Sequence, residues 1–121
     1  MGGVWQNVWG QIHPREIASQ TALRELHEET GLRPTKFYQL NTVNTFYLAK
    51  DDCTWHCPCF CAVVPGEVAV LLNDEYDAFR WLAHEDYLKQ IMWPGERLAA
   101  AELCREILDH GPSEPYLHIH L

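Results

Sequence analysis

The sequence predicts an α/β sandwich, and the pattern of apolar residues along its 121 residues is the main reason. Two segments, one in each half of the chain, carry apolar residues at helical spacing. Between them lie segments rich in aromatic and β-branched residues, which are typical of strands. The length fits one domain with a single core, so residues 1–121 are predicted to form one unit.

The first predicted helix covers residues 16–30, where apolar side chains recur every four residues and form one stripe. Gly31 follows at the position of a C-cap glycine, and Pro34 comes soon after it. Upstream, residues 4–9 alternate enough for a short strand, and Pro14 indicates a loop. The expected order at this end is therefore strand, loop and helix.

Residues 37–48 are predicted to form one or two strands, and residues 55–64 another. Pro58 lies within the second of these, and because proline lacks an N–H, it favours an edge strand or an irregular start. Shorter strands are expected over residues 68–72 and 78–82.

Two helices are predicted in the C-terminal third. Residues 84–90 favour a short helix, and residues 96–109 a longer amphipathic one. From Ala100 onward, apolar residues of the longer helix fall at i, i+3, i+4, i+7 and i+8. Gly111 is expected to end this helix, and residues 110–121 are expected to be a tail.

The charge balance narrows the classes of partner. Seventeen acidic against nine basic residues give a net charge of −8, which argues against duplex DNA or RNA as a partner. Small phosphorylated ligands stay compatible, because divalent cations can lie between an acidic protein and a polyphosphate. The sequence shows no apolar run long enough to span a bilayer and no signal peptide, so we expect no membrane partner and a cytoplasmic location.

Five cysteines are present, and four of them lie within residues 53–61. An odd number crowded in this way does not resemble a secreted disulfide framework, so reduced thiols are expected. Cys57, Cys59 and Cys61 would share one face of a strand, which suggests either a zinc site or buried strand cysteines. Structural zinc sites more often use two distant C-x2–4-C pairs, so buried cysteines are the preferred interpretation.

The predicted first helix carries an unusual acidic face. Glu25, Glu28 and Glu29 are spaced i, i+3 and i+4, and like charges at this spacing cost a helix about 0.2–0.5 kcal/mol per pair. Arg24 offsets part of this repulsion by pairing with Glu28. A hard divalent cation such as Mg²⁺ would remove it, because Mg²⁺ prefers carboxylate oxygens and takes further ligands from substrate phosphates. The alternative is a solvated acidic surface.

The residues around this face decide between the two readings. The stretch from Gly10 to Leu32 reads G-x5-E-x7-R-E-L-x-E-E-x-G-L, which matches the Nudix signature at every specified position. The chain therefore resembles the Nudix hydrolase family. Residues 5–10 and 75–82 are also similar to the branch of dihydroneopterin triphosphate and dATP pyrophosphohydrolase-like members.

The resemblance implies a Nudix-type α/β/α sandwich with a mixed sheet, and a Mg²⁺ site in which Mn²⁺ can substitute. Within the signature, the implied metal ligands are Glu25, Glu28 and Glu29, the bracing residues are Glu16 and Arg24, and the structural glycines are Gly10, in a tight turn, and Gly31.

The family's chemistry is attack of water on phosphorus within a P–O–P link. The implied activity is Mg²⁺-dependent cleavage of a nucleoside triphosphate or a nucleoside-diphosphate-linked substrate, with release of a monophosphate product. Glu25 and Glu75 are the candidate general bases, although Glu75 could equally be an ordinary loop acid. Trp5 could stack on a base or belong to the core, and Tyr47 lies where some dinucleoside polyphosphate hydrolases carry a specificity tyrosine.

Three positions depart from common family residues. Trp9 stands where many members have glycine, and its bulk could reshape the pocket mouth. His13 replaces a common acid, and Arg15 replaces a common glycine. Arg15 could contact a substrate phosphate, although a solvated loop arginine is the preferred interpretation.

Only nine residues precede Gly10, whereas family members usually have a few dozen. The sheet is therefore expected to lack the usual N-terminal strands. A partner chain could complete it, or residues 116–121 could add a strand. Because an uncovered sheet edge invites pairing, a homodimer is predicted. The alternatives to an active enzyme are a truncated nucleotide- and metal-binding module and a dimeric assembly protein.

Overall fold

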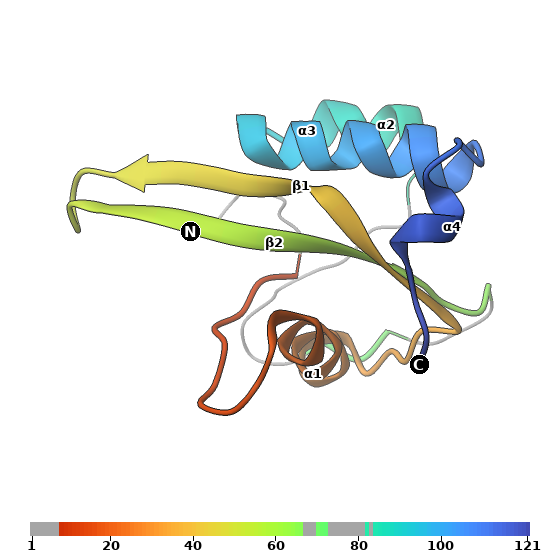
Figure 1. Cartoon of the computed structure of the whole chain (residues 1–121), viewed down its shortest axis with the longest axis horizontal. Helices are drawn as coiled ribbons and strands as arrows, with labels where there is room; N and C mark the ends of the chain where they lie inside the picture. The colour runs from red at the N-terminus through yellow and green to blue at the C-terminus, as the bar shows by residue number, and fades with distance from the viewer. Residues whose placement is uncertain (1–7, 67–69, 73–81, 83) are drawn as a thin grey trace.

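The computed structural model describes residues 8–66, 70–72, 82 and 84–121. Figure 1 shows three layers, with helix α1 (Ala18–Thr30) on one side of a β-sheet and helices α2 (His84–Gln90) and α3 (Pro94–Glu102) on the other. This arrangement confirms the predicted α/β sandwich. Helix α2 has the predicted bounds, and α1 begins two residues later than predicted.

The sheet is built around a long hairpin. Strands β1 (Lys36–Leu48) and β2 (Cys53–Val63) pair antiparallel, and β3 (His118–Ile119) pairs antiparallel with the other edge of β1, which gives the order β2-β1-β3. Both pairings among the described residues are antiparallel, so this part of the sheet does not show the mixed character that was expected. Pro58 lies in β2, the outer strand of this order, as its missing N–H predicts.

A β-bulge bends β1 beneath helix α3. The register shifts between Gln39 and Val43. Within the bulge, the backbone N–H groups of Asn41 and Thr42 donate to the carboxylate of Glu102 at 2.6 and 2.7 Å. Glu102 is 4% exposed, and its carboxylate accepts from two part-buried backbone groups that the strand ladder leaves out.

The main core lies between the sheet and the C-terminal helices. Its buried members come from β1, β2, α3, the following π-helix and helix α4 (Glu114–Leu117), and they are Tyr38, Leu40, Cys61, Ala99, Ile107 and Leu117. Cys61 is a free thiol in this core, where burial raises its pKa to about 11. The interpretation of buried strand cysteines is therefore confirmed for Cys61.

The predicted helix over residues 96–109 is present but changes character halfway. Helix α3 continues directly into a π-helix, η1 (Leu103–Leu108). The wider π turns rotate the following side chains away from the regular helical phase. Ala100, Cys104 and Ile107 are buried as the periodicity predicts, whereas Leu108 is 50% exposed. The prediction for Leu108 was wrong because it assumed one uniform helix.

Residues 110–121 are not a simple tail, which corrects that expectation. They form helix α4 (Glu114–Leu117) and strand β3. Glu106 accepts hydrogen bonds from the N–H and hydroxyl of Ser113 at 3.1 and 2.6 Å, and the hydroxyl of Tyr38 donates to Glu114 at 3.1 Å. Strand β3 pairs with Phe37 and Tyr38. The alternative in which the C-terminal end adds a strand is thus confirmed.

Three predicted strands fall wholly or partly outside the described residues, those over 4–9, 68–72 and 78–82. Val8 and Trp9, which are described, are not in a strand. Within the described part of the chain, no helix is both long and apolar enough to cross a membrane.

Candidate active site

Local hydrogen bonds cap helix α1 at both ends. At its start, the N–H of Ile17 donates to the side chain of Gln20 at 3.0 Å. At its end, the N–H of Gly31 donates to the carbonyl of His27 at 2.8 Å, with Gly31 at φ +74°. Glycine adopts this left-handed conformation without the steric cost that a side chain adds, so the prediction of Gly31 as a C-cap is confirmed.

Arg24 is the centre of the site, because its guanidinium binds three carboxylates. Two of its nitrogens donate to Glu16, Nε at 2.7 Å and Nη2 at 3.1 Å. Its Nη1 donates to Glu25 at 2.6 Å and to Glu28 at 3.1 Å. Nη2 also donates to the carbonyl of Gln11 at 3.0 Å, which ties the preceding loop to the helix.

Glu16 is held as an anion inside this network. The Arg24 guanidinium is the main cause of a pKa near 2 for Glu16, and the backbone N–H of His13, at 3.0 Å, is the second. The hydroxyl of Thr21 adds a bond of 2.8 Å. The same pairing raises the pKa of Arg24. These contacts give Glu16 and Arg24 a geometry that suits the bracing role implied for them.

Gly10 is small because Glu25 lies against it. A Cβ atom at position 10 would lie 2.2 Å from Cγ of Glu25, a distance that real Cβ contacts do not show. The backbone turn lies at Pro14 and Arg15, and Gly10 has no positive φ. The expectation that Gly10 supplies a tight turn is corrected, since the requirement is close approach between the loop and α1.

The three carboxylates that are predicted to bind the metal differ in how far they are exposed. The side chain of Glu25 is 15% exposed and that of Glu28 is 53% exposed, whereas Glu29 is 1% exposed. Carboxylate oxygens are the donors that Mg²⁺ prefers, so the residue types fit the ion. In this structure, Arg24 lies between Glu25 and Glu28, and no three ligands converge among the described residues. Their role as metal ligands stays a prediction.

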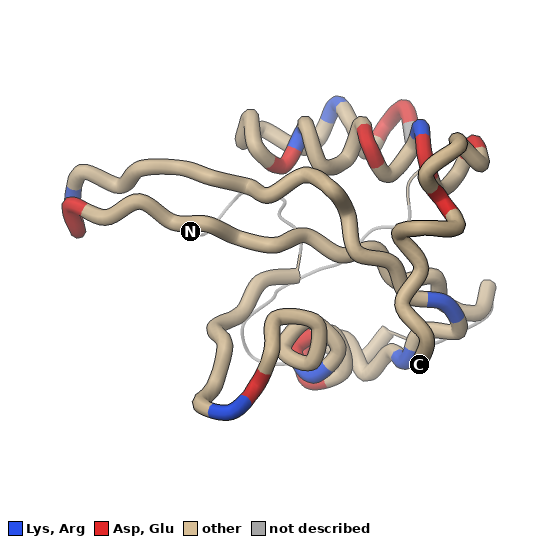
Figure 2. The backbone as a smooth tube through the Cα atoms, viewed as in Figure 1, with Lys and Arg blue, Asp and Glu red and all other residues tan. Residues whose placement is uncertain are grey.

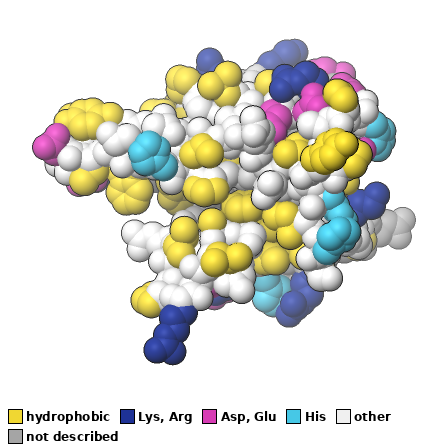
Figure 3. Space-filling model, viewed as in Figure 1, with side chains coloured by type: hydrophobic (Ala, Val, Ile, Leu, Met, Phe, Trp, Pro, Cys, Tyr) yellow, Lys and Arg dark blue, Asp and Glu magenta, His cyan; other side chains and the backbone are white. Residues whose placement is uncertain are grey.

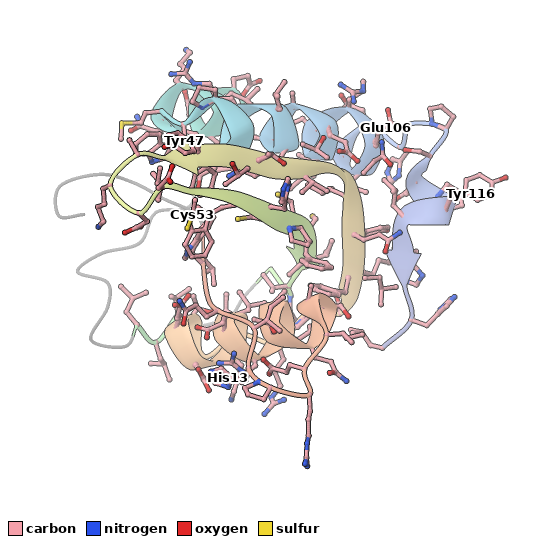
Figure 4. The ribbon with its side chains drawn as sticks, turned by 60° about the vertical axis from the view of Figure 1, so that its left-hand side comes forward. His13, Tyr47, Cys53, Glu106 and Tyr116 are labelled. Carbon is pink, nitrogen blue, oxygen red and sulfur yellow. The ribbon has the colours of Figure 1, made fainter. Side chains whose placement is uncertain are left out.

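Of the remaining predicted residues, the two that the structure describes, Arg15 and Tyr47, have no hydrogen bond or ion pair with this network. Arg15 is exposed, and its φ of +70° explains why glycine suits the position. Tyr47 is 58% exposed, and its hydroxyl donates to Asp52 at 2.6 Å. In Figure 4, Tyr47 lies on the hairpin, far from His13, which lies in the loop before α1. The two further candidates, Trp5 and Glu75, lie outside the described residues.

One residue of the network, Thr21, and one contact near it, that of Trp9 with Phe46, were not predicted from the sequence. Thr21 is 5% exposed and bonds Glu16, and a polar residue on the buried side of a helix was the signal that could have indicated it. Trp9 contacts Phe46, with ring centroids 6.0 Å apart, and so brings the segment before Gly10 against β1. No sequence pattern indicates this contact, because the two residues are distant along the chain.

Comparison with known proteins shows the family and the fold. The model of the NUDIX domain family matches residues 1–103. A NUDIX hydrolase structure from Listeria monocytogenes shares the fold, with a TM-score of 0.69 and 24% identity over 88% of this chain and 77% of that one.

Two curated relatives are similar over most of this chain. An octanoyltransferase of Myxococcus xanthus is 35% identical over 98 residues, which are 79% of this chain and 27% of that protein. The asymmetrical bis(5'-nucleosyl)-tetraphosphatase of Mus musculus is 31% identical over 87 residues, 68% of this chain and 57% of that protein. The chain therefore matches about a quarter of the first relative and somewhat over half of the second. Because the family model covers most of its length, the chain belongs to the NUDIX domain family.

Proposed function

We propose that this chain is a Mg²⁺-dependent hydrolase that cleaves a pyrophosphate bond in a nucleoside polyphosphate and releases a monophosphate product. The observation that carries the proposal is the Arg24 guanidinium, which draws Glu16, Glu25 and Glu28 together. Carboxylates kept close in this way are a ready half-site for a divalent cation.

The division of labour among these residues follows from their contacts. Glu25, Glu28 and Glu29 would hold the cation, which neutralises charge on the polyphosphate and lowers the pKa of a bound water. Glu16 anchors Arg24 and so fixes the direction of the guanidinium. Glu28 is the most exposed of the three acids, so its side chain can turn from Arg24 toward a ligand. Glu25 and Glu75 remain the candidate bases.

Two substrate classes are carried into the proposal. Residues 5–10 and 75–82 favour a nucleoside triphosphate or dihydroneopterin triphosphate. The mouse relative is named a bis(5'-nucleosyl)-tetraphosphatase, which favours a dinucleoside polyphosphate. The octanoyltransferase name adds no acyl-transfer proposal, because only 27% of that protein is matched.

A panel of substrates tests the proposal. The folded protein is incubated with dNTPs, dihydroneopterin triphosphate, ADP-ribose and diadenosine polyphosphates, with Mg²⁺, with Mn²⁺ and with a chelator. We expect phosphate-containing products from at least one substrate, dependent on the metal and reduced about a hundredfold or more by Glu28→Gln. Folded protein that leaves the whole panel intact would sink the proposal.

A nucleotide- and metal-binding module without turnover is the second candidate. It is favoured by the position of Arg24 between Glu25 and Glu28, where it competes with a cation for the same oxygens. Calorimetry that shows metal-dependent nucleotide binding, together with no product in the panel, would select this candidate over the enzyme.

Self-association and a cytoplasmic location stay predictions. Strand β2 is an outer strand among the described residues, and an outer strand can pair with a second copy. Sedimentation at micromolar concentration should then give a dimer, and a stable monomer would reject both the homodimer and the assembly role.

A further inference from the structure

Two aromatic side chains of the hairpin, Phe46 and Trp55, lie where Trp9 in the loop before α1 packs on β1. The rings of Trp9 and Phe46 have centroids 6.0 Å apart and an interplanar angle of 36°. Phe46 is paired directly with Trp55 across the hairpin, so both side chains are on one face of the sheet, with Cβ atoms about 4.5–5.5 Å apart. Trp9 and Trp55 are nevertheless 44% and 38% exposed. Trp9, Phe46 and Trp55 form an aromatic cluster that is not fully buried in the core.

The aromatic cluster is directly connected to the acidic helix. Trp9 precedes Gly10, and the α-carbon of Gly10 lies so close to Glu25 that a methyl group does not fit between them. The exposed indole is therefore one residue along the chain from a contact with a predicted metal ligand. Gly10 thus links the aromatic cluster, through Trp9, to the acidic helix, through Glu25.

The charges around the two faces differ. Residues 37–49 and 53–63 contain no Asp, Glu, Lys or Arg, and Figure 2 shows the charges of the hairpin confined to its ends. Figure 3 shows hydrophobic side chains along the projecting end of the hairpin. A neutral aromatic surface suits the flat, uncharged base of a nucleotide, whereas the carboxylates of α1 suit a cation and the polyphosphate that it binds.

We propose that Trp9 is a specificity-determining residue, which stacks on the base of a nucleotide whose polyphosphate lies at α1. This inference rests on the proposed function and deepens it, because it selects substrates with an aromatic base over polyphosphates without one. Phe46 packs against Trp9 and so positions the indole.

Calorimetry with two probes tests the proposal. The full chain is titrated in Mg²⁺ with a non-hydrolysable methylene analogue of ATP and, separately, with inorganic tripolyphosphate. Trp9→Ala should bind the analogue about tenfold more weakly, in the range of a lost base–aromatic stack, and bind tripolyphosphate unchanged. Trp9→Phe keeps an aromatic face and should lose about threefold or less. Tyr116→Ala is the matched control, because Tyr116 is 85% exposed and points away from the molecule in Figure 4.

A further variant separates stacking from packing. Trp9→Leu keeps an apolar side chain against Phe46 and should still bind the analogue about tenfold more weakly. Equal losses for both probes, or no loss for the analogue in Trp9→Ala and Trp9→Leu, would overturn the inference. So would a wild-type protein that binds tripolyphosphate as tightly as the analogue, or that binds no analogue. Because these readouts are binding constants, the inference can fail while hydrolysis persists, and it can hold if the panel shows no turnover.

Discussion

Glu28 of α1 and Glu102 of α3 are held by different kinds of partner. Glu28 is 53% exposed and bonds a side chain, that of Arg24. Glu102 is 4% exposed and bonds two backbone N–H groups, those of Asn41 and Thr42. A side-chain partner can turn away and release its carboxylate, whereas the backbone groups are fixed by the fold. The same residue type thus serves folding in one region, whereas in the other it is proposed to serve ligand binding.

Glu102→Ala should have the largest effect on stability, because it removes the carboxylate that bonds backbone N–H groups. The substitution leaves the part-buried N–H groups of Asn41 and Thr42 without their acceptor, which costs about 1 kcal/mol for each group, at the low end of the range for buried groups. We expect the free energy of unfolding, measured in urea, to fall by about 2 kcal/mol. In the matched variant Glu28→Gln it should change by less than about 1 kcal/mol. Similar values for the two variants would show that the contrast is wrong.

Gly10→Ala should sharpen the comparison, because it disturbs the carboxylates of α1 and leaves Glu102 untouched. The new Cβ would lie 2.2 Å from Cγ of Glu25, so the loop or the carboxylate must move. We expect about 1–3 kcal/mol of destabilisation, together with a clear loss of turnover. Gly66→Ala is the control, because a Cβ at Gly66 meets nothing within 4 Å, and its effect should stay within about 0.5 kcal/mol. Equal effects of the two alanines on turnover would contradict the proposed contact.

The smallest expected effect is the change with pH in the stability that Glu16 contributes. Its pKa is lowered from 4.5 to about 2, chiefly by Arg24, so its ionised form favours the folded state. That contribution is complete above pH 4.5 and is lost as the pH falls through the folded pKa. Wild type should therefore be more stable than Glu16→Gln at pH 6, and the gap should narrow between pH 4.5 and 2. Chemical denaturation at several pH values measures this, and a gap that stays constant with pH would be inconsistent with the Arg24 pairing.

Local patterns in the sequence were enough for most elements. Helix α1, its C-cap at Gly31, the hairpin strands and α2 depend on residues close together along the chain, and each was predicted to within about two residues. The pairing of Arg24 with Glu28, four residues apart, was also predicted, because i,i+4 side chains on a helix are neighbours.

The sequence by itself therefore determined the family signature, the acidic helix and the two long strands. Only the tertiary structure decided why position 10 needs glycine, that residues 118–119 complete an edge of the sheet, and that Trp9 lies on Phe46. It also placed Tyr47 far from His13. The physical reason is range: periodicity and capping act within a few residues, whereas these features are contacts between segments that meet only after the chain has folded.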